Sequence, residues 1–215
     1  MGTDIHLQIE VKINGGWKWI NSYLPLGICK WAYIPLDTNR NYYLFSMLAN
    51  VRNGDMFEPI SEPKGLPEDI SDELYDYYYK GNLGDHSYSY LNAKELKDYF
   101  ERTKNKIATE EGYVNIQNYK EFKLNGEPNS YCGGVGGTNV EIISNEKMEE
   151  IIKNNIESDK SYYTLVSWNK KYVDFIGWDV YWKYSNLNDF KEFIYVDGKP
   201  KCVIEDVRIV FGFDS

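Results

Sequence analysis

Two histidines, His6 and His86, are the only imidazole groups in this chain of 215 residues. Each lies in a short polar segment, Gly2-Thr3-Asp4-Ile5-His6 for the first and Asp85-His86-Ser87-Tyr88-Ser89 for the second. Histidine transfers protons near neutral pH and binds metals, so acid-base or metal chemistry is expected at these segments. Asp4 and His6 share one face of an expected strand, roughly 7 Å apart, so both could contact one ligand.

Three interpretations of His6 follow from this position. It could donate a hydrogen bond on a half-exposed sheet face, contact a ligand or substrate, or bind a metal. A zinc site would need Asp4, His6, His86 and one more acid, because zinc in proteins takes three or four such ligands. We predict no metal and no cofactor.

The second segment places an acid, an imidazole and two hydroxyl groups, Ser87 and Ser89, directly before an expected helix. Free amide groups at a helix start favour an anion, so the segment could hold a phosphate or could simply cap the helix. We do not expect a Ser-His-Asp triad from Asp85, His86 and Ser87. Side chains adjacent in sequence rarely converge on one point, and the chain has no G-x-S-x-G nucleophile elbow.

Arginine is scarce, with Arg40, Arg52, Arg102 and Arg208 among 24 basic residues. Arg40 and Arg52 flank one expected helix, and a guanidinium can bind phosphate or carboxylate through two hydrogen bonds. The alternative for each is a surface ion pair worth little. The glycine-rich segment 132–139, CGGVGGTN, lacks the lysine of a phosphate-binding loop and favours a flap or β-bulge.

Hydrophobic periodicity predicts the elements that position these residues. Alternating residues predict a strand over 5–13, and Asn14-Gly15-Gly16 predicts a hairpin turn into a strand over 17–20. Helical spacing predicts helices over 39–52, starting at Asn39 or Thr38, over 92–107 and over 145–157. Further strands are expected over 140–143, 162–166, 172–181, 193–197 and 202–211. This order predicts an α+β fold with a mostly antiparallel sheet and about three helices.

The length favours a single domain over residues 1–215, with 57–85 as an irregular loop or insertion because three prolines interrupt it. Ser71 to Leu74 could start one short helix there. Residues 68–79 combine five acids with four tyrosines, which suits either a solvated loop or a surface for a basic partner.

Composition excludes several function classes. A net charge of -9 opposes direct binding to a nucleic-acid backbone. Three scattered cysteines indicate neither a disulfide framework nor a zinc knuckle, which favours a reducing cytoplasm. No apolar run approaches the length that crosses a membrane, so no membrane association is expected.

These motifs resemble those of an uncharacterised family of tailed-phage and bacterial proteins that begin with a stretch similar to MGTDIH. The similar segments include Arg40-Asn41-Tyr42, the stretch 63–67, His86-Ser87 and the closing stretch 207–214. The resemblance implies a phage origin and the cytoplasm of an infected bacterial host, but no particular activity. Many relatives have a second histidine where Tyr88 stands here, which weakens a histidine-pair or two-metal mechanism.

We therefore predict a phage accessory protein, with an anti-defence role, that binds and sequesters a small anionic, nucleotide-derived signalling ligand. The expected ligand-binding residues are Asp4, His6, Arg40, Arg52, His86, Ser87, Ser89 and Arg208. One alternative is a metal-independent phosphodiesterase, or a related nucleotide-cleaving enzyme, that uses His6 or His86, with Asp4, for acid-base catalysis. Another is an acidic protein-binding inhibitor or nucleic-acid mimic. A homo-oligomer is compatible with each.

Overall fold

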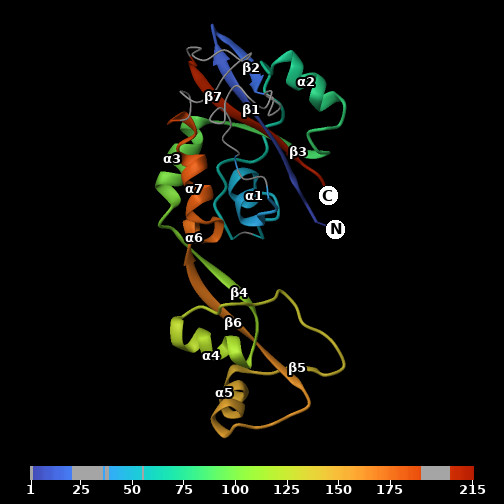
Figure 1. The fold of residues 1–215 in the computed structure, drawn as a ribbon, viewed down its shortest axis with the longest axis vertical. Coiled ribbons are helices and arrows are strands. Elements are labelled where there is room, and N and C mark those ends of the chain that lie inside the picture. Colours follow the sequence, from blue (N-terminus) through green and yellow to red (C-terminus); the bar gives the residue numbers. More distant parts are fainter. Residues whose placement is uncertain (1, 21–35, 37–38, 55, 190–203) are drawn as a thin grey trace, which may run out of the picture. The chain divides into compact units, whose positions relative to one another are not determined.

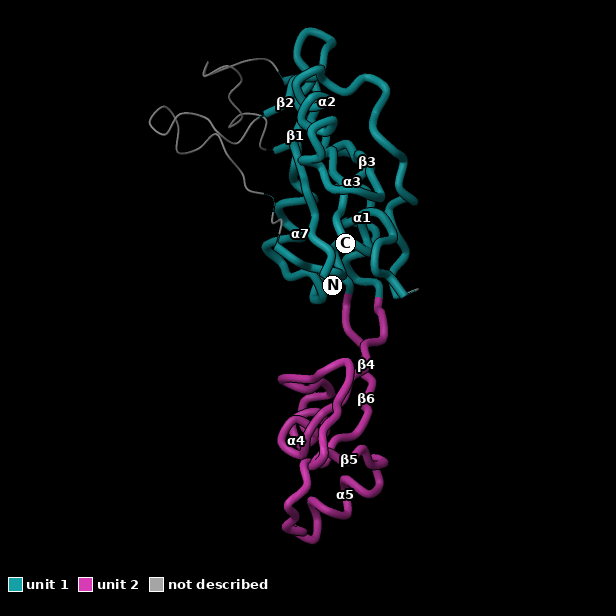
Figure 2. The backbone as a smooth tube through the Cα atoms, turned by 90° about the vertical axis from the view of Figure 1, so that its right-hand side faces the viewer, with its two compact units in different colours: residues 1–106, 172–215 teal, residues 107–171 magenta. Residues whose placement is uncertain are grey.

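The structure is a computed structural model that describes residues 2–20, 36, 39–54, 56–189 and 204–215. The fold is α+β, as the sequence predicts, with two sheets among the described residues (Figure 1). Contacts divide the chain into two compact units, unit 1 with residues 1–106 and 172–215 and unit 2 with residues 107–171 (Figure 2). The single domain expected from the chain length stays a prediction.

Unit 1 contains a four-stranded antiparallel sheet in the order β2-β1-β7-β3. The strands are β1 (Ile5–Ile13), β2 (Gly16–Ile20), β3 (His86–Asn92) and β7 (Asp206–Phe213). The predicted hairpin between β1 and β2 is confirmed, because Asn14 and Gly15 have the positive φ angles of 51° and 78° that its tight turn requires.

Strand β7 is the buried centre of this sheet. The apolar face expected for it, formed by Val207, Ile209, Phe211 and Phe213, is fully buried. Phe213 packs edge-on against Phe45 from the first helix, with ring centroids 5.2 Å apart. Each such ring or branched side chain contributes roughly 1.5–3 kcal/mol when it leaves water, so β7 holds much of the unit 1 core.

The described residues form seven helices, and the expected number of about three is wrong. The three expected helices are present as α1 (Tyr42–Ala49), α3 (Ala93–Thr103) and α5 (Asn145–Asn154). The cap of α1 is Asn41, which accepts a hydrogen bond from the Leu44 amide, rather than Asn39 or Thr38. The short helix after Ser71 is confirmed as α2 (Asp72–Tyr79). The helix α4 (Ile116–Asn125) was not expected.

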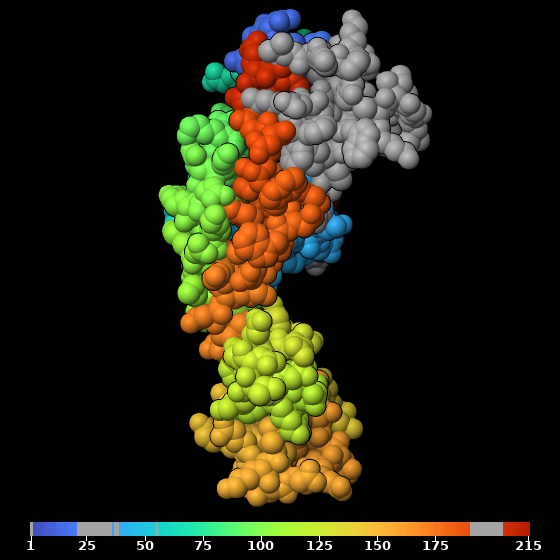
Figure 3. Space-filling view, turned by 60° about the vertical axis from the view of Figure 1, so that its left-hand side comes forward, coloured from blue at the N-terminus to red at the C-terminus, as the bar shows by residue number. Residues whose placement is uncertain are grey.

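The strand expected over 172–181 is wrong, because the chain there forms α6 (Tyr172–Ile176) and α7 (Trp178–Ser185). Aromatic and β-branched residues favour strands, but here the buried positions recur at helical spacing, and packing decides. Helix α7 lies beside α3, where Tyr181 donates a hydrogen bond of 2.6 Å to Glu101 (Figure 3). The strand and turn expected over 193–200 lie outside the described residues.

Apart from α2, the segment 57–85 is irregular, as expected, but it is fastened to unit 1. The Ile60 amide donates to the Met47 carbonyl at 2.8 Å, and the Gly65 amide donates to the Tyr88 carbonyl at 2.9 Å. The Ser71 amide donates to the buried Glu10 carboxylate at 2.8 Å. The acidic stretch is therefore held at its start by the sheet.

Unit 2 has a mixed three-stranded sheet in the order β4-β6-β5. Its strands are β4 (Ile107–Asn115), β5 (Val140–Ile142) and β6 (Ser161–Lys171), so the strand expected over 162–166 continues to Lys171. Strands and helices share one core, formed by Val114, Tyr119, Met148, Val166 and Trp168. In the glycine-rich segment, a Cβ atom at Gly133, Gly134 or Gly136 would meet no described atom of another segment within 4 Å, so no close backbone approach explains those glycines.

The space around Gly212 in β7 shows how closely the segment 83–88 packs against this strand. A Cβ atom there would lie 2.2 Å from the Leu83 carbonyl oxygen and 2.6 Å from the Tyr88 ring. We expect Gly212→Ala to lower the free energy of unfolding by about 1–3 kcal/mol, measured by urea denaturation. The control Gly16→Ala, whose Cβ would have its nearest neighbour at 3.9 Å, should change little. Equal midpoints for the two variants would contradict this account.

Candidate functional site

A polar network joins the start of β1 to the end of β7 in unit 1. The His6 Nε2 atom lies 3.0 Å from one carboxylate oxygen of Asp214, and the Asp4 amide donates to the other at 2.9 Å. Arg40 donates two hydrogen bonds to the Asp4 carboxylate, of 2.8 Å and 2.6 Å. The structure thus brings together three of the predicted site residues and adds Asp214, which the sequence prediction did not include.

The register of β1 against β7 creates this network. Ile5 pairs with Phe213 and His6 pairs with Gly212, so the beginning of β1 and the end of β7 lie side by side. Gly2 also contributes, because a Cβ atom at that position would lie 2.1 Å from the Arg40 guanidinium. A glycine there leaves the space in which Arg40 reaches Asp4.

The charges in the network stabilise one another. The two hydrogen bonds from Arg40 lower the pKa of the Asp4 carboxyl below its usual value, and the same contact raises the pKa of Arg40. The hydrogen bond with His6, followed by the one from the Asp4 amide, lowers the pKa of Asp214. Both acids are therefore ionised at neutral pH, and Arg40 shares its charge with Asp4.

Arg52, at the other end of α1, has a different environment. Its Nε atom donates to the Thr3 hydroxyl at 3.0 Å, and its guanidinium lies 5.9 Å from the centre of the Tyr42 ring. The backbone of Arg52 adopts a φ of 58°, which is uncommon for a residue other than glycine or asparagine. Among the residues that the structure describes, no acidic side chain forms an ion pair with Arg52.

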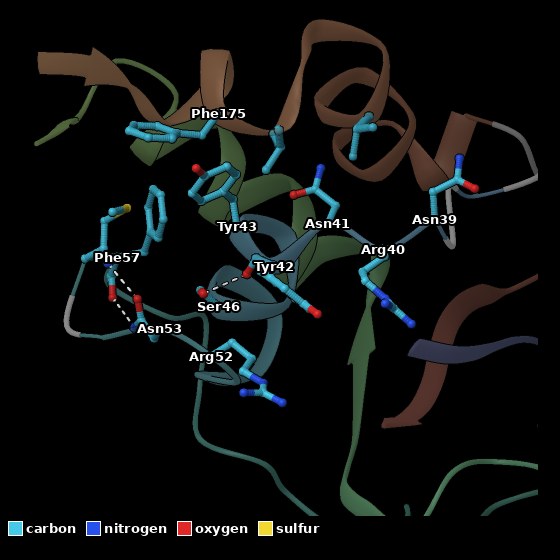
Figure 4. Close-up of a pocket in the computed structure, with 13 residues that line it drawn as sticks. Asn39, Arg40, Asn41, Tyr42, Tyr43, Ser46, Arg52, Asn53, Phe57 and Phe175 are labelled. Carbon is cyan, nitrogen blue, oxygen red and sulfur yellow. Dashed lines mark hydrogen bonds between the residues drawn. The ribbon is translucent and has the colours of Figure 1, made fainter. Parts of the chain in front are cut away.

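Both arginines line one pocket of about 570 Å³ (Figure 4). In the close-up, Arg40, Tyr42 and Arg52 point to one side of α1, whereas the rings of Tyr43, Phe57 and Phe175 gather on the other. These three rings contact one another, with centroids 5.0 to 5.9 Å apart. Asn39, Asn41 and Asn53 also line the pocket. It therefore combines guanidinium groups, amides and aromatic surface.

Arg208 does not join this pocket, which corrects its predicted place. It is buried, with its Nε atom 2.7 Å from the Glu10 carboxylate and another nitrogen 2.6 Å from the Asp69 carboxylate. Its guanidinium also lies 4.0 Å from the centre of the Trp17 ring. Because its guanidinium is paired with Glu10 in β1 and with Asp69, Arg208 holds the segment 57–85 against the sheet.

The residues of the second polar segment are also placed differently from the prediction. His86 and Ser87 begin strand β3 rather than preceding a helix, so no helix start is available there for a phosphate. His86 is paired with Phe213, next to the Gly212 that pairs with His6, and neighbouring residues of a strand face opposite sides. The two histidines therefore do not meet. Ser89 is fully buried, and its hydroxyl accepts a hydrogen bond from the Lys64 amide.

Sequence reasoning missed Thr3, Tyr42 and Asp214. Thr3 is buried, and its amide donates to the Tyr42 hydroxyl at 3.3 Å, which ties the start of the chain to α1. Asp214 had a detectable signal, since it lies two residues beyond Gly212 and so continues the face that carries Arg208. The sequence held no comparable signal for the rings of Phe57 and Phe175 in the pocket, because these residues come from segments far apart in sequence.

Within the described residues no group of three or more histidine, cysteine, aspartate or glutamate side chains could hold a metal ion. None of the helices in those residues combines the length and the apolar composition needed to cross a membrane. Comparison with protein-family models, curated proteins and solved structures finds no match to this chain. The arrangement of its own residues is therefore the basis for assigning a function.

The polar network predicts the pH behaviour of two carboxylates. Because their pKa values are lowered in the folded chain, the contacts of Asp4 and Asp214 favour folding above about pH 4, and this contribution is lost as the pH falls through the folded values. We expect Arg40→Gln to raise the pKa of Asp4 and His6→Ala to raise that of Asp214, as measured by carboxyl ¹³C NMR titration. If Arg40→Gln left the Asp4 titration unchanged, the ion pair would not exist in solution.

The buried position of Arg208 predicts a loss of stability rather than of binding. Arg208→Met leaves Glu10 buried without its cation and should lower the free energy of unfolding by about 3–5 kcal/mol. The double variant Glu10→Leu/Arg208→Met should recover part of this loss, because no buried charge is then left unpaired. Chemical denaturation of the three proteins measures both effects, and a neutral Arg208→Met would overturn the structural role.

Proposed function

We propose that this chain binds a small anionic, nucleotide-derived ligand in the pocket that Arg40 and Arg52 line together with the rings of Tyr42, Tyr43, Phe57 and Phe175. The observation that carries this proposal is that two of the four arginines in the chain line one pocket together with these rings. A phosphate group and a nucleobase need these two kinds of surface.

Arg52 supplies the main anion contact in this proposal. Arg40 already forms two hydrogen bonds with Asp4, so a phosphate would have to compete with that carboxylate. Arg52 is held through its Nε atom by Thr3, which leaves its two terminal nitrogens to form a pair of hydrogen bonds with one phosphate. The Tyr42 ring beside it supports the guanidinium.

An aromatic ring supplies the second half of the recognition, and Tyr42 is the exposed ring of the pocket, because Phe57 and Phe175 are buried. Stacking of a base on an aromatic side chain contributes roughly 1–3 kcal/mol per base and tolerates different bases. Asn41 also lines the pocket, where its side-chain oxygen caps α1 by accepting from the Leu44 amide. Its side-chain nitrogen is a donor that could distinguish bases, because stacking alone does not.

The resemblance to tailed-phage proteins supports a role for this binding during phage infection. A small phage protein that binds a nucleotide-derived signal without changing it would lower the free concentration of that signal in the infected bacterium. On this proposal the chain is a sequestering, anti-defence protein. Its function then depends on its affinity for the signal and not on catalytic turnover.

One observation favours the enzymatic alternative. Asp214 contacts the Nε2 atom of His6, so the imidazole is oriented by a carboxylate, as in many acid-base catalysts. His6 would then exchange protons through Nδ1 to cleave a phosphodiester. Incubation of candidate nucleotides with the wild type and with His6→Ala, followed by mass spectrometry of the products, separates cleavage from capture.

Calorimetric titration with a panel of cyclic nucleotides and ADP-ribose derivatives tests the binding proposal. For any ligand that binds, Arg52→Gln should weaken the affinity about tenfold to a hundredfold, because hydrogen bonds to a charged group contribute roughly 1.5–3 kcal/mol. Arg102→Gln is the matched control, since Arg102 is an exposed arginine paired with Glu58 and does not line the pocket. The absence of binding by every member of the panel, or equal losses in the two variants, would refute the proposal.

A further inference from the structure

We propose that Asp85, His86 and Ser87 form a separate reactive site, in which the Ser87 hydroxyl is a nucleophile for acyl groups and His86 is its general base. The sequence argued against such a triad, because adjacent side chains rarely converge. The structure nevertheless brings the His86 Nδ1 atom to 2.8 Å from the Ser87 hydroxyl oxygen. On the other side of the ring, Nε2 lies 3.9 Å from the Asp85 carboxylate.

These positions define the roles of the two ring nitrogens. A carboxylate near Nε2 favours the tautomer that carries its proton on Nε2, which leaves Nδ1 as the acceptor. The Ser87 hydroxyl then donates its hydrogen bond to Nδ1, the arrangement in which a histidine can remove the proton of a nucleophilic serine. The Asp85 carboxylate, 3.9 Å from Nε2, has the place of the acid that orients the base.

The backbone of Ser87 explains how neighbouring side chains converge. Its φ is 52°, in the left-handed region, and three of the other four non-glycine residues with positive φ in the described part of the chain are asparagines. Serine tolerates this conformation less well than asparagine, and backbone strain of this kind gathers at functional sites. Ser87 also lies where the register between β3 and β7 shifts from His86 to Ser89. Such irregularities redirect side chains.

The His86 ring packs against the core and is partly exposed to solvent. The His86 ring stacks on Phe213, with centroids 6.1 Å apart and planes 23° apart, and Phe213 is fully buried. The side chain of His86 is 37% exposed, so a small reagent can reach it. None of these three residues lines the Arg40 and Arg52 pocket, so this site is independent of the proposed ligand pocket.

The reaction that this arrangement supports is acyl transfer from an ester. The Ser87 oxygen forms a bond to the carbonyl carbon while its proton moves to Nδ1 of His86. The bond between that carbon and the leaving alcohol then breaks, and the imidazolium returns the proton to the alcohol oxygen. Water, deprotonated by His86 in the same way, attacks the acyl-serine and releases the acid with the serine restored.

The full-length protein treated with a fluorophosphonate probe tests the proposal directly. The probe forms a bond between phosphorus and the serine oxygen and releases fluoride, so one adduct at Ser87 is expected in peptide mass spectra. The variant Ser87→Gly should fold, because glycine adopts the same positive φ without strain, and it should lose the adduct. His86→Asn should slow labelling at least tenfold, since a general base contributes on the order of a hundredfold or more.

Arg102→Gln is the control, because Arg102 is exposed, pairs with Glu58 and lies outside the pocket, so this variant should leave Ser87 labelling unchanged. Hydrolysis of p-nitrophenyl acetate, with an initial burst of nitrophenolate that Ser87→Gly abolishes, is the second readout. If the probe fails to label Ser87, or if His86→Asn is labelled as fast as the wild type, the proposal is overturned and the residues only shape the start of β3.

Discussion

Strand β7 lies between β1 and β3, and its register with these two neighbours positions three of the contacts described above. It sets Asp214 beside His6, Arg208 beside Glu10 and Phe213 beneath His86. Since side chains alternate between the faces of a strand, a slip of one residue would send each of these groups to the wrong side. The last strand of the chain therefore decides both the core of unit 1 and the chemistry at its edge.

The arginines differ in their access to water, and this difference separates a structural role from a role at the surface. Arg208 is buried with Glu10, where an unpaired charge would be costly, so its role is structural. Arg40 is exposed and paired, whereas Arg52 is held by a hydroxyl and an aromatic ring. Only the last of these environments leaves a guanidinium able to take an anion without first giving up a carboxylate. This difference, rather than the scarcity of arginine, identifies the proposed anion contact.

The two histidines belong to separate arrangements. His6 is held by Asp214 at the end of the network that leads to Arg40, and His86 is held between Phe213 and Ser87. Their strands flank β7 on opposite sides, and the register turns the two imidazoles to opposite faces. A mechanism that needs two histidines on one substrate is therefore incompatible with the sheet. The two proposed activities, ligand capture at the pocket and acyl transfer at Ser87, share no residue.

The sequence by itself determined the elements whose signals are local. The alternation of β1, the Asn14-Gly15 turn and the Asn92 cap of α3 depend on neighbouring residues, and all three are found in the structure. It also indicated which residue types were worth following, among them Asp4, His6 and Arg40. Only the tertiary structure decided that Tyr172 to Ser185 is helical, that Arg208 is buried and that His6 meets Asp214 instead of His86. These outcomes depend on packing and strand register between segments up to 208 residues apart, which no local pattern encodes.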